Sequence, residues 1–242
     1  MRKQKLMFLF VTVLLISAIS GCKKDEIRQI DESYNPVINA ADFTKSTQLT
    51  NPYFRFDAGK KYIYEGQTGD GLERIVVKRR AITKEILGIT CIVVNDSVTL
   101  NGILIENTDD WYAQDNLGNV WYFGEDVKNY NSNGTFKDKH GSWEAGVDGA
   151  KPGITMLANP QKGIGYRQEY YFNEAEDEAI VEETGMTLTT TFGTFNNVVK
   201  TRDFTALEPD LNENKFYAPN VGLIKEVNLT DKEEIVLIKI EN

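Results

Sequence analysis

Residues 110–125 read DWYAQDNLGNVWYFGE, and no other segment of the chain is so dense in aromatic side chains. A short polar stretch that contains Asp115 and Gly118 separates two runs in which aromatic and polar residues are mixed. Asp115 can accept hydrogen bonds from the backbone of a turn, and Gly118 can adopt the left-handed conformation that a tight hairpin needs. The segment therefore predicts a strand, a tight turn and a second strand.

Alternation along these two strands places Trp111 and Tyr112 on opposite faces, and Trp121 and Tyr122 likewise. One face should belong to the core. The other is a candidate aromatic platform for a sugar or another flat ligand, with Asp110 beside it. The alternative is that the rings are core residues and cross-strand pairs, which stabilise a sheet by about 0.2–1 kcal/mol each.

Similar short strands, separated by Gly, Asn and Asp, follow one another over residues 51–242. The predicted strands are residues 62–65, 73–82, 86–95, 98–106, 110–114, 120–124, 127–130, 166–172, 179–183, 187–192, 197–204, 215–218, 222–229 and 234–240. No long segment repeats apolar residues at helical spacing. We therefore predict one antiparallel β domain with little helix.

Residues 141–154, GSWEAGVDGAKPGI, form a Gly-rich stretch that we expect to be a long connection. Long connections inside a compact domain are uncommon and are often functional. Its Trp143, Glu144, Asp148 and Lys151, together with the exposed aromatic residues of the hairpin, are therefore the candidate ligand-binding residues.

The chain begins with three basic side chains among its first five residues, followed by an apolar run from Leu6 to Ile19 and then by Ser-Gly-Cys22. This order is typical of a secretory signal peptide, residues 1–21, whose apolar run is shorter than the roughly 20 residues that span a bilayer. The Gly-Cys ending resembles the lipobox of bacterial lipoproteins. The resemblance implies that Cys22 is acylated, with palmitate as a typical chain, and anchors the protein in a membrane.

Residues 23–26, Lys-Lys-Asp-Glu, resemble the export signal of Bacteroidota lipoproteins. That resemblance implies an outer-membrane lipoprotein that faces the cell exterior, with a periplasm-facing anchor as the alternative. We expect residues 22–50 to be the lipidated cysteine and a polar tether, with a short helical turn at residues 40–43. Residues 51–242 are then the single β domain.

Charge and composition exclude several classes of function. The net charge is −9, and the loss of three basic residues with the signal peptide brings the mature chain near −12, which argues against nucleic acid as a partner. His140 is the single histidine, so no multi-histidine zinc site can form within the chain, and no phosphate-binding loop or dinucleotide motif occurs. Cys91 lies among β-branched residues and is expected to be buried and inert. We therefore predict no cofactor, no metal and no catalytic residue.

The body, roughly residues 51–228, is similar to a family of uncharacterised secreted bacterial proteins. The shared segments are 110–125, 141–154 and YAPNVGLIKE at residues 217–226. The family has no assigned activity, so the resemblance implies no catalytic residue. The last segment also resembles bacterial lipoproteins with a strongly curved antiparallel sheet, similar to the half-barrel of lipoprotein carriers. We therefore expect an all-β fold with a strongly curved antiparallel sheet or an incomplete barrel.

The sequence favours a membrane-anchored, non-enzymatic module at the cell surface that binds a ligand or partner, with glycans and lipids as the ligand classes considered. One alternative is a periplasm-facing carrier or assembly factor for acyl chains, which needs an apolar concave groove. Another is a glycan hydrolase that uses two carboxylates across a cleft, drawn from Asp110, Glu144, Asp148 and Glu169.

Overall fold

The computed structural model describes residues 31–210 and 212–242. The predicted signal peptide, the lipid attachment at Cys22 and the export signal lie outside the described residues. Residues 35–242 form one compact unit by themselves. No helix among the described residues is long and apolar enough to cross a bilayer.

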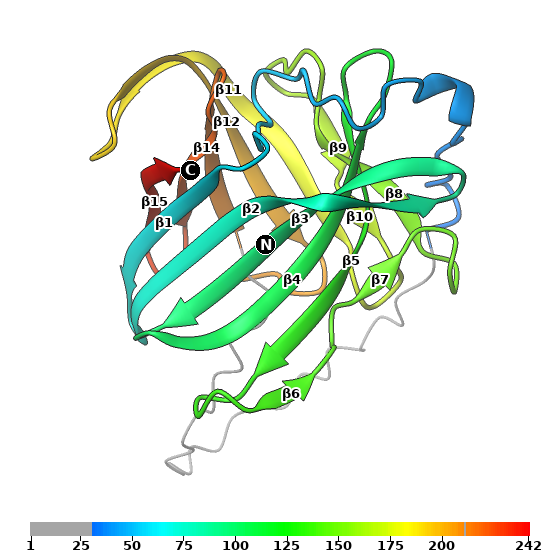
Figure 1. The fold of residues 1–242 in the computed structure, drawn as a ribbon. Coiled ribbons are helices and arrows are strands. Elements are labelled where there is room, and N and C mark those ends of the chain that lie inside the picture. Colours follow the sequence, from blue (N-terminus) through cyan, green and yellow to red (C-terminus); the bar gives the residue numbers. More distant parts are fainter. Residues whose placement is uncertain (1–30, 211) are drawn as a thin grey trace, which may run out of the picture. The chain divides into compact units, whose positions relative to one another are not determined.

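This unit consists almost entirely of antiparallel strands, as predicted (Figure 1). A single 3-10 helix, η1 (Ala40–Asp42), lies where the sequence predicts a helical turn, and Asn39 caps it. The strands are β1 (Lys61–Thr68), β2 (Gly71–Ile86), β3 (Ile89–Leu100), β4 (Ile103–Gln114), β5 (Val120–Tyr130), β6 (Phe136–Asp138), β7 (Trp143–Glu144), β8 (Lys151–Met156), β9 (Gly165–Arg167), β10 (Glu169–Tyr170), β11 (Asp177–Thr189), β12 (Thr194–Thr205), β13 (Asn212–Ala218), β14 (Gly222–Asn228) and β15 (Glu234–Glu241).

The sheet runs in the order β10-β8-β5-β4-β3-β2-β1-β15-β14-β13-β12-β11-β9, and β6 and β7 pair with β5. Its two edge strands, β9 and β10, are separated in the chain only by Gln168, so the sheet nearly closes on itself like a barrel. The backbone N–H of Gln168 donates to the carbonyl of Asp177 at 2.8 Å. A Cβ on Gly153 of β8 would lie 2.4 Å from the backbone of Gln168, so only glycine permits this close approach. The expected curved antiparallel sheet is thus confirmed.

Two-residue turns join the long strands of the meander. Leu87 and Gly88 have φ of 52° and 74°, and Asn101 and Gly102 have φ of 52° and 81°. Positive φ at both central residues is the geometry that matches the twist of a two-residue hairpin. The expected strand over residues 98–106 is therefore wrong, because Asn101-Gly102 is a turn that separates β3 from β4.

The expected long connection over residues 141–154 instead contains the strand β7 and the start of the strand β8. β7 pairs Trp143 with Glu125 of β5, and β8 pairs Ile154 with Trp121. Gly124 has φ of 132°, and a Cβ there would lie 2.2 Å from the carbonyl oxygen of Trp143. The lack of a side chain at Gly124 therefore lets β7 pair with β5.

Residues 40–56 pack across one end of the sheet, which is the upper end in Figure 1. Phe43 contacts Trp121 and Phe123 edge to face, at centroid distances of 6.2 and 5.8 Å. Phe54 packs on Tyr112, from the inside of the sheet, at 4.8 Å. Part of the segment assigned to a tether by sequence, residues 43–50, is therefore packed on the β domain.

The turn at residues 115–119 has the chemistry that the sequence predicts. Asp115 Oδ1 accepts the backbone N–H groups of Leu117 and Asn119, at 3.0 and 2.8 Å. Its Oδ2 accepts from Asn119 Nδ2 and from the indole Nε1 of Trp121, at 2.8 and 2.9 Å. Gly118 has a φ of 97°.

Asp115→Ala should lower the free energy of unfolding by about 2 kcal/mol, because it leaves several turn donors without an acceptor. Urea unfolding followed by tryptophan fluorescence measures this loss. Leu117→Ala in the same turn is the control, because Leu117 is 82% exposed, and it should change stability by less than about 0.5 kcal/mol. Equal stability of the two variants would contradict the assigned role of Asp115.

Candidate functional site

The inner face of the sheet is identified by a cluster of buried apolar side chains. The cluster joins Tyr62 and Tyr64 of β1 to Val77, Val94 and Leu237 of β2, β3 and β15. Residues directly opposite one another in an antiparallel pair share a face, so the strand registers extend this assignment around the sheet.

The inner face is aromatic and apolar at the end that residues 40–56 cover. Phe54 forms a cluster there with Val120, Met156 and Tyr217. Val120 and Met156 lie on the neighbouring strands β5 and β8, whereas Tyr217 lies on β13, which is far from them in the strand order. The cluster therefore closes this end of the sheet with side chains.

Further along the same strands, away from the covered end, the inner face becomes acidic. β4 passes from Tyr112 to Asp110 and Glu106, and β13 passes from Tyr217 to Lys215 and Glu213. The carboxyl side chains that the registers place on this acidic half are Glu73, Asp96, Glu106, Asp110, Glu125, Asp203, Glu213 and Glu226. Within the strands that the structure describes, Lys215 is the basic residue placed among them.

Burial and mutual repulsion keep several of these carboxyls protonated at higher pH than usual. Burial, with the nearby carboxylate of Glu226 adding to it, raises the pKa of Asp96 to about 6 and that of Glu213 to about 8. Burial and the charge of Asp96 raise the pKa of Glu106 to about 7. Burial and Glu125 raise the pKa of Asp110 well above its ordinary value. The acidic half therefore titrates near neutral pH.

Lys215 is buried between two of these carboxyls. Its Nζ lies 3.1 Å from Asp203 Oδ2 and 3.9 Å from Glu213 Oε2. Burial lowers the pKa of Lys215, but the charges of Asp203 and Glu226 outweigh this and raise the pKa well above its usual value. Asp203 also accepts hydrogen bonds from Thr201 Oγ1 at 2.6 Å and from Gln168 Nε2 at 3.2 Å. Lys215 and Asp203 thus form a buried ion pair, and Asp203 is held by two further hydrogen bonds.

Some of the candidate residues from the sequence come together on this inner face. The Tyr122 hydroxyl donates to Asp110 Oδ1 at 2.5 Å, and its ring stacks on Tyr112 at 4.8 Å. Trp143 meets Tyr122 edge to face at 5.3 Å and donates from Nε1 to Glu169 Oε2 at 2.9 Å. Asp110, Tyr112, Tyr122 and Trp143 therefore form one continuous wall of the inner face.

Two further candidates, Trp111 and Glu144, meet on the outer face. Lys84 Nζ lies 3.4 Å from the centroid of the Trp111 ring and 2.6 Å from Glu144 Oε2. Trp111 is only 7% exposed, because Lys84 and its surroundings cover the ring. This is a cation–π contact joined to an ion pair, and it fixes β7 against β2.

The remaining candidates lie apart from both groups. Trp121 is half-buried on the outer face against Phe43. Asp148 is exposed in the turn between β7 and β8, with a φ of 50°. Lys151 Nζ lies 5.4 Å from the centroid of the Tyr170 ring. The structure thus places the sequence-predicted residues in several environments, and the largest group of them, four of the nine, meets on the inner face.

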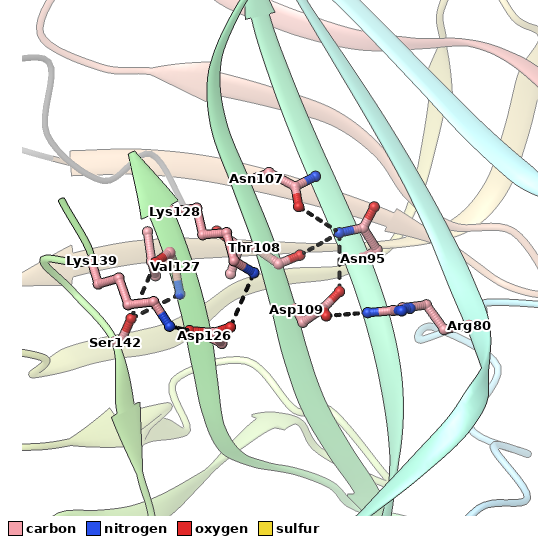
Figure 2. A network of polar contacts seen from close by, with 10 residues as sticks. All are labelled: Arg80, Asn95, Asn107, Thr108, Asp109, Asp126, Val127, Lys128, Lys139 and Ser142. Atoms are coloured by element: carbon pink, nitrogen blue, oxygen red, sulfur yellow. Dashed lines mark hydrogen bonds and ion pairs between the residues drawn. The ribbon is translucent and has the colours of Figure 1, made fainter. Parts of the chain in front are cut away.

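The outer face of β2–β5 carries a separate polar network (Figure 2). Asn95 Nδ2 donates to Asp109 Oδ1 at 3.0 Å, and Arg80 forms an ion pair with the same carboxylate. Asp126 accepts from Lys128 at 3.1 Å and from Lys139 at 2.7 Å. Charges on this face are paired in the ordinary way of a solvated surface.

Sequence reasoning missed Asp96, Glu106, Glu213 and Lys215. A weak signal exists, because each lies at even spacing from an aromatic or apolar residue of the inner face on its own strand, as Lys215 does from Tyr217. That spacing also fits an ordinary strand with one solvated face, so it identifies no site. Among the described residues, no group of three or more His, Cys, Asp or Glu side chains is placed to hold a metal ion. Cys91 is fully buried, as expected, and burial raises the pKa of its thiol to about 12.

Comparisons with known proteins add little to these structural observations. No family model and no curated protein matches the sequence. A crystal structure of a candidate lipoprotein from Parabacteroides distasonis ATCC 8503 is similar with a TM-score of 0.42 and 15% sequence identity, over 80% of this chain and 100% of that chain.

Proposed function

We propose that this protein is a membrane-anchored lipoprotein of the outer membrane whose β domain binds a ligand on its inner face and performs no reaction on it. The observation that carries the proposal is the gathering of carboxyl groups on the inner face, away from the end that residues 40–56 cover. Buried charges are costly, and proteins keep them where they have a use. Asp96, Glu106 and Glu226 are partly exposed, so solvent reaches this acidic half.

The acidic half argues against the two alternative functions. A carrier of acyl chains needs an apolar inner face, whereas here carboxyls line half of it. A hydrolase needs two carboxyls that face each other across a cleft. Of the carboxyls considered for this role, Glu144 pairs with Lys84 on the outer face and Asp148 lies in an exposed turn, both apart from Asp110 on the inner face. Binding of a polar ligand is therefore the function that we favour.

Membrane attachment through Cys22 is tested by substitution. Cys22→Ser should move the protein from the membrane pellet to the soluble fraction, because the acyl chains supply the affinity for the bilayer and the acidic chain adds none. Cys91→Ala, at the other cysteine, is the control and should stay in the pellet. Equal amounts of both variants in the membrane pellet would contradict lipid anchoring at Cys22.

Exposure at the cell exterior, which we infer from residues 23–26, has its own test. Proteinase K added to intact cells should digest the protein. Full protection on intact cells, with digestion after lysis, would place the protein on the periplasmic side instead.

Ligand binding is tested by native mass spectrometry of the protein purified from its own cells in detergent. We expect a retained small molecule that denaturation releases unchanged. Recovery of no ligand of any class would overturn the proposed function, and so would release of a hydrolysed product.

A further inference from the structure

We propose, building on the ligand-binding function above, that the acidic half of the inner face binds an organic cation with more than one ammonium group, such as a polyamine. Asp96 and Glu213 are the residues assigned to contact it. Glu106 and Glu226 supply the surrounding negative charge.

The carboxyl groups of the acidic half outnumber the basic groups that the structure places among them. Lys215 Nζ is nearer to Asp203 than to Glu213, at 3.1 Å against 3.9 Å, so the lysine mainly neutralises Asp203. Within residues 31–210 and 212–242, no ion pair neutralises Asp96, Glu106 or Glu226. In their ionised form these carboxyls attract a cation and repel an anion, and a bound cation in turn favours the ionised form.

Two buried carboxyl oxygens of the acidic half lack a hydrogen-bond donor among the described residues. Within the described part of the chain, no donor reaches Asp96 Oδ1 or Glu213 Oε1, and both atoms are shielded from solvent. Glu213 is only 3% exposed. A buried acceptor without a donor costs about 1–3 kcal/mol, and more when it is charged. Each of these two oxygens is therefore placed to accept a hydrogen bond from a bound ligand.

The carboxyl groups of Asp96, Glu213 and Glu226 come from strands on different sides of the nearly closed sheet. Asp96 is on β3 and Glu213 is on β13, on opposite arcs of the nearly closed sheet, and the charge of Glu226 on β14 acts on both. Tyr64, whose hydroxyl donates to the Leu223 carbonyl at 3.1 Å, feels the charges of Asp96 and Glu226 as well. All of these carboxyls lie on the inner face, which also carries the ring of Tyr64 on β1, and an aromatic ring suits an ammonium group.

The spacing of the carboxylates favours an organic cation over a metal ion. A metal site needs several oxygen atoms that converge on one point at about 2.0–2.6 Å. No such group of side chains occurs among residues 31–210 and 212–242. Carboxylates that are spread over two arcs fit a cation whose charges are separated along a chain, because each ammonium can donate to a different carboxylate.

The test is titration calorimetry of the full-length, detergent-purified lipoprotein with spermidine, with putrescine and Mg²⁺ as comparison ligands. We expect saturable binding of spermidine that is at least tenfold tighter than that of Mg²⁺. The double variant Asp96→Asn/Glu213→Gln should weaken spermidine binding at least tenfold. The double variant Glu234→Gln/Glu241→Gln removes the same net charge from outside the acidic half and should bind like the wild type.

A second readout separates ligand contact from a structural role. The Asp96→Asn/Glu213→Gln variant should unfold at a higher temperature than the wild type, because it removes repelling buried carboxyls while it loses binding. Unchanged spermidine binding in this variant, or equal binding of Mg²⁺, would overturn the cation site. Absence of spermidine binding together with a neutral ligand retained in native mass spectrometry would overturn the cation site and leave the proposed function standing.

Discussion

Lys215→Met is expected to lower the free energy of unfolding at pH 7 by about 3–5 kcal/mol, because it removes the buried partner of Asp203 and keeps the carboxylate. The side chains of Lys215 and Asp203 are 10% and 7% exposed, so water cannot replace the lost interaction. Methionine has a similar length and keeps the apolar contacts of the lysine stem. The loss should therefore be electrostatic.

The matched control is Lys225→Met on the neighbouring strand β14. Lys225 pairs with Glu234 at 2.6 Å, but the Glu234 side chain is 51% exposed. Such surface pairs contribute about 0–1 kcal/mol. Guanidinium unfolding of both variants measures the difference, and equal stability of the two would show that Lys215 does not neutralise a buried carboxylate. Repeating the measurement at pH 5 should reduce the loss in Lys215→Met, since protonation of neighbouring carboxyls lowers the repulsion.

The second large effect is a stability that falls as the pH rises from 5 to 8. The folded-state pKa values of Asp96, Glu106 and Glu213 are raised to about 6, 7 and 8, above the unfolded values near 4. In this window the folded chain holds protons that the unfolded chain has released, so deprotonation favours unfolding as the pH increases. Each unit between the two pKa values corresponds to about 1.4 kcal/mol. We expect the free energy of unfolding to be about 3 kcal/mol or more lower at pH 8 than at pH 5.

Other titrating groups do not cancel this trend. Lys215 also has a raised pKa, but its contribution is present below its unfolded pKa, which lies above this window. Asp57, Asp126 and Glu241 have lowered pKa values, and their contribution is lost only as the pH falls through those values, below the window. Glu213→Gln should flatten the slope between pH 5 and 8, because it removes one titrating group. A free energy of unfolding that is constant over pH 5–8 would contradict the assignment of an acidic inner face.

The hairpin at residues 110–125 illustrates what local sequence determines. Its turn depends on Asp115 and Gly118, which act through neighbours within a few residues. The opposite orientation of Trp111 and Tyr112 follows from the geometry of any extended strand. The antiparallel β class follows for the same reason, because alternation and turn residues are local properties of the chain.

The acidic half of the inner face shows what only the tertiary structure decided. Strict alternation from Tyr122 would turn Glu125 outward, but the bulge between them puts Glu125 opposite Asp110 on the inner face. Asp96 and Glu213 lie on opposite arcs of the inner face because the sheet closes through Gln168, far from either residue in sequence. Strand register, bulges and closure arise from hydrogen bonds between distant segments, so no local pattern could place these carboxyls together. The sequence by itself therefore determined the antiparallel β class and the chemistry of the turns, and the nearly closed sheet decided which side chains meet on its inner face.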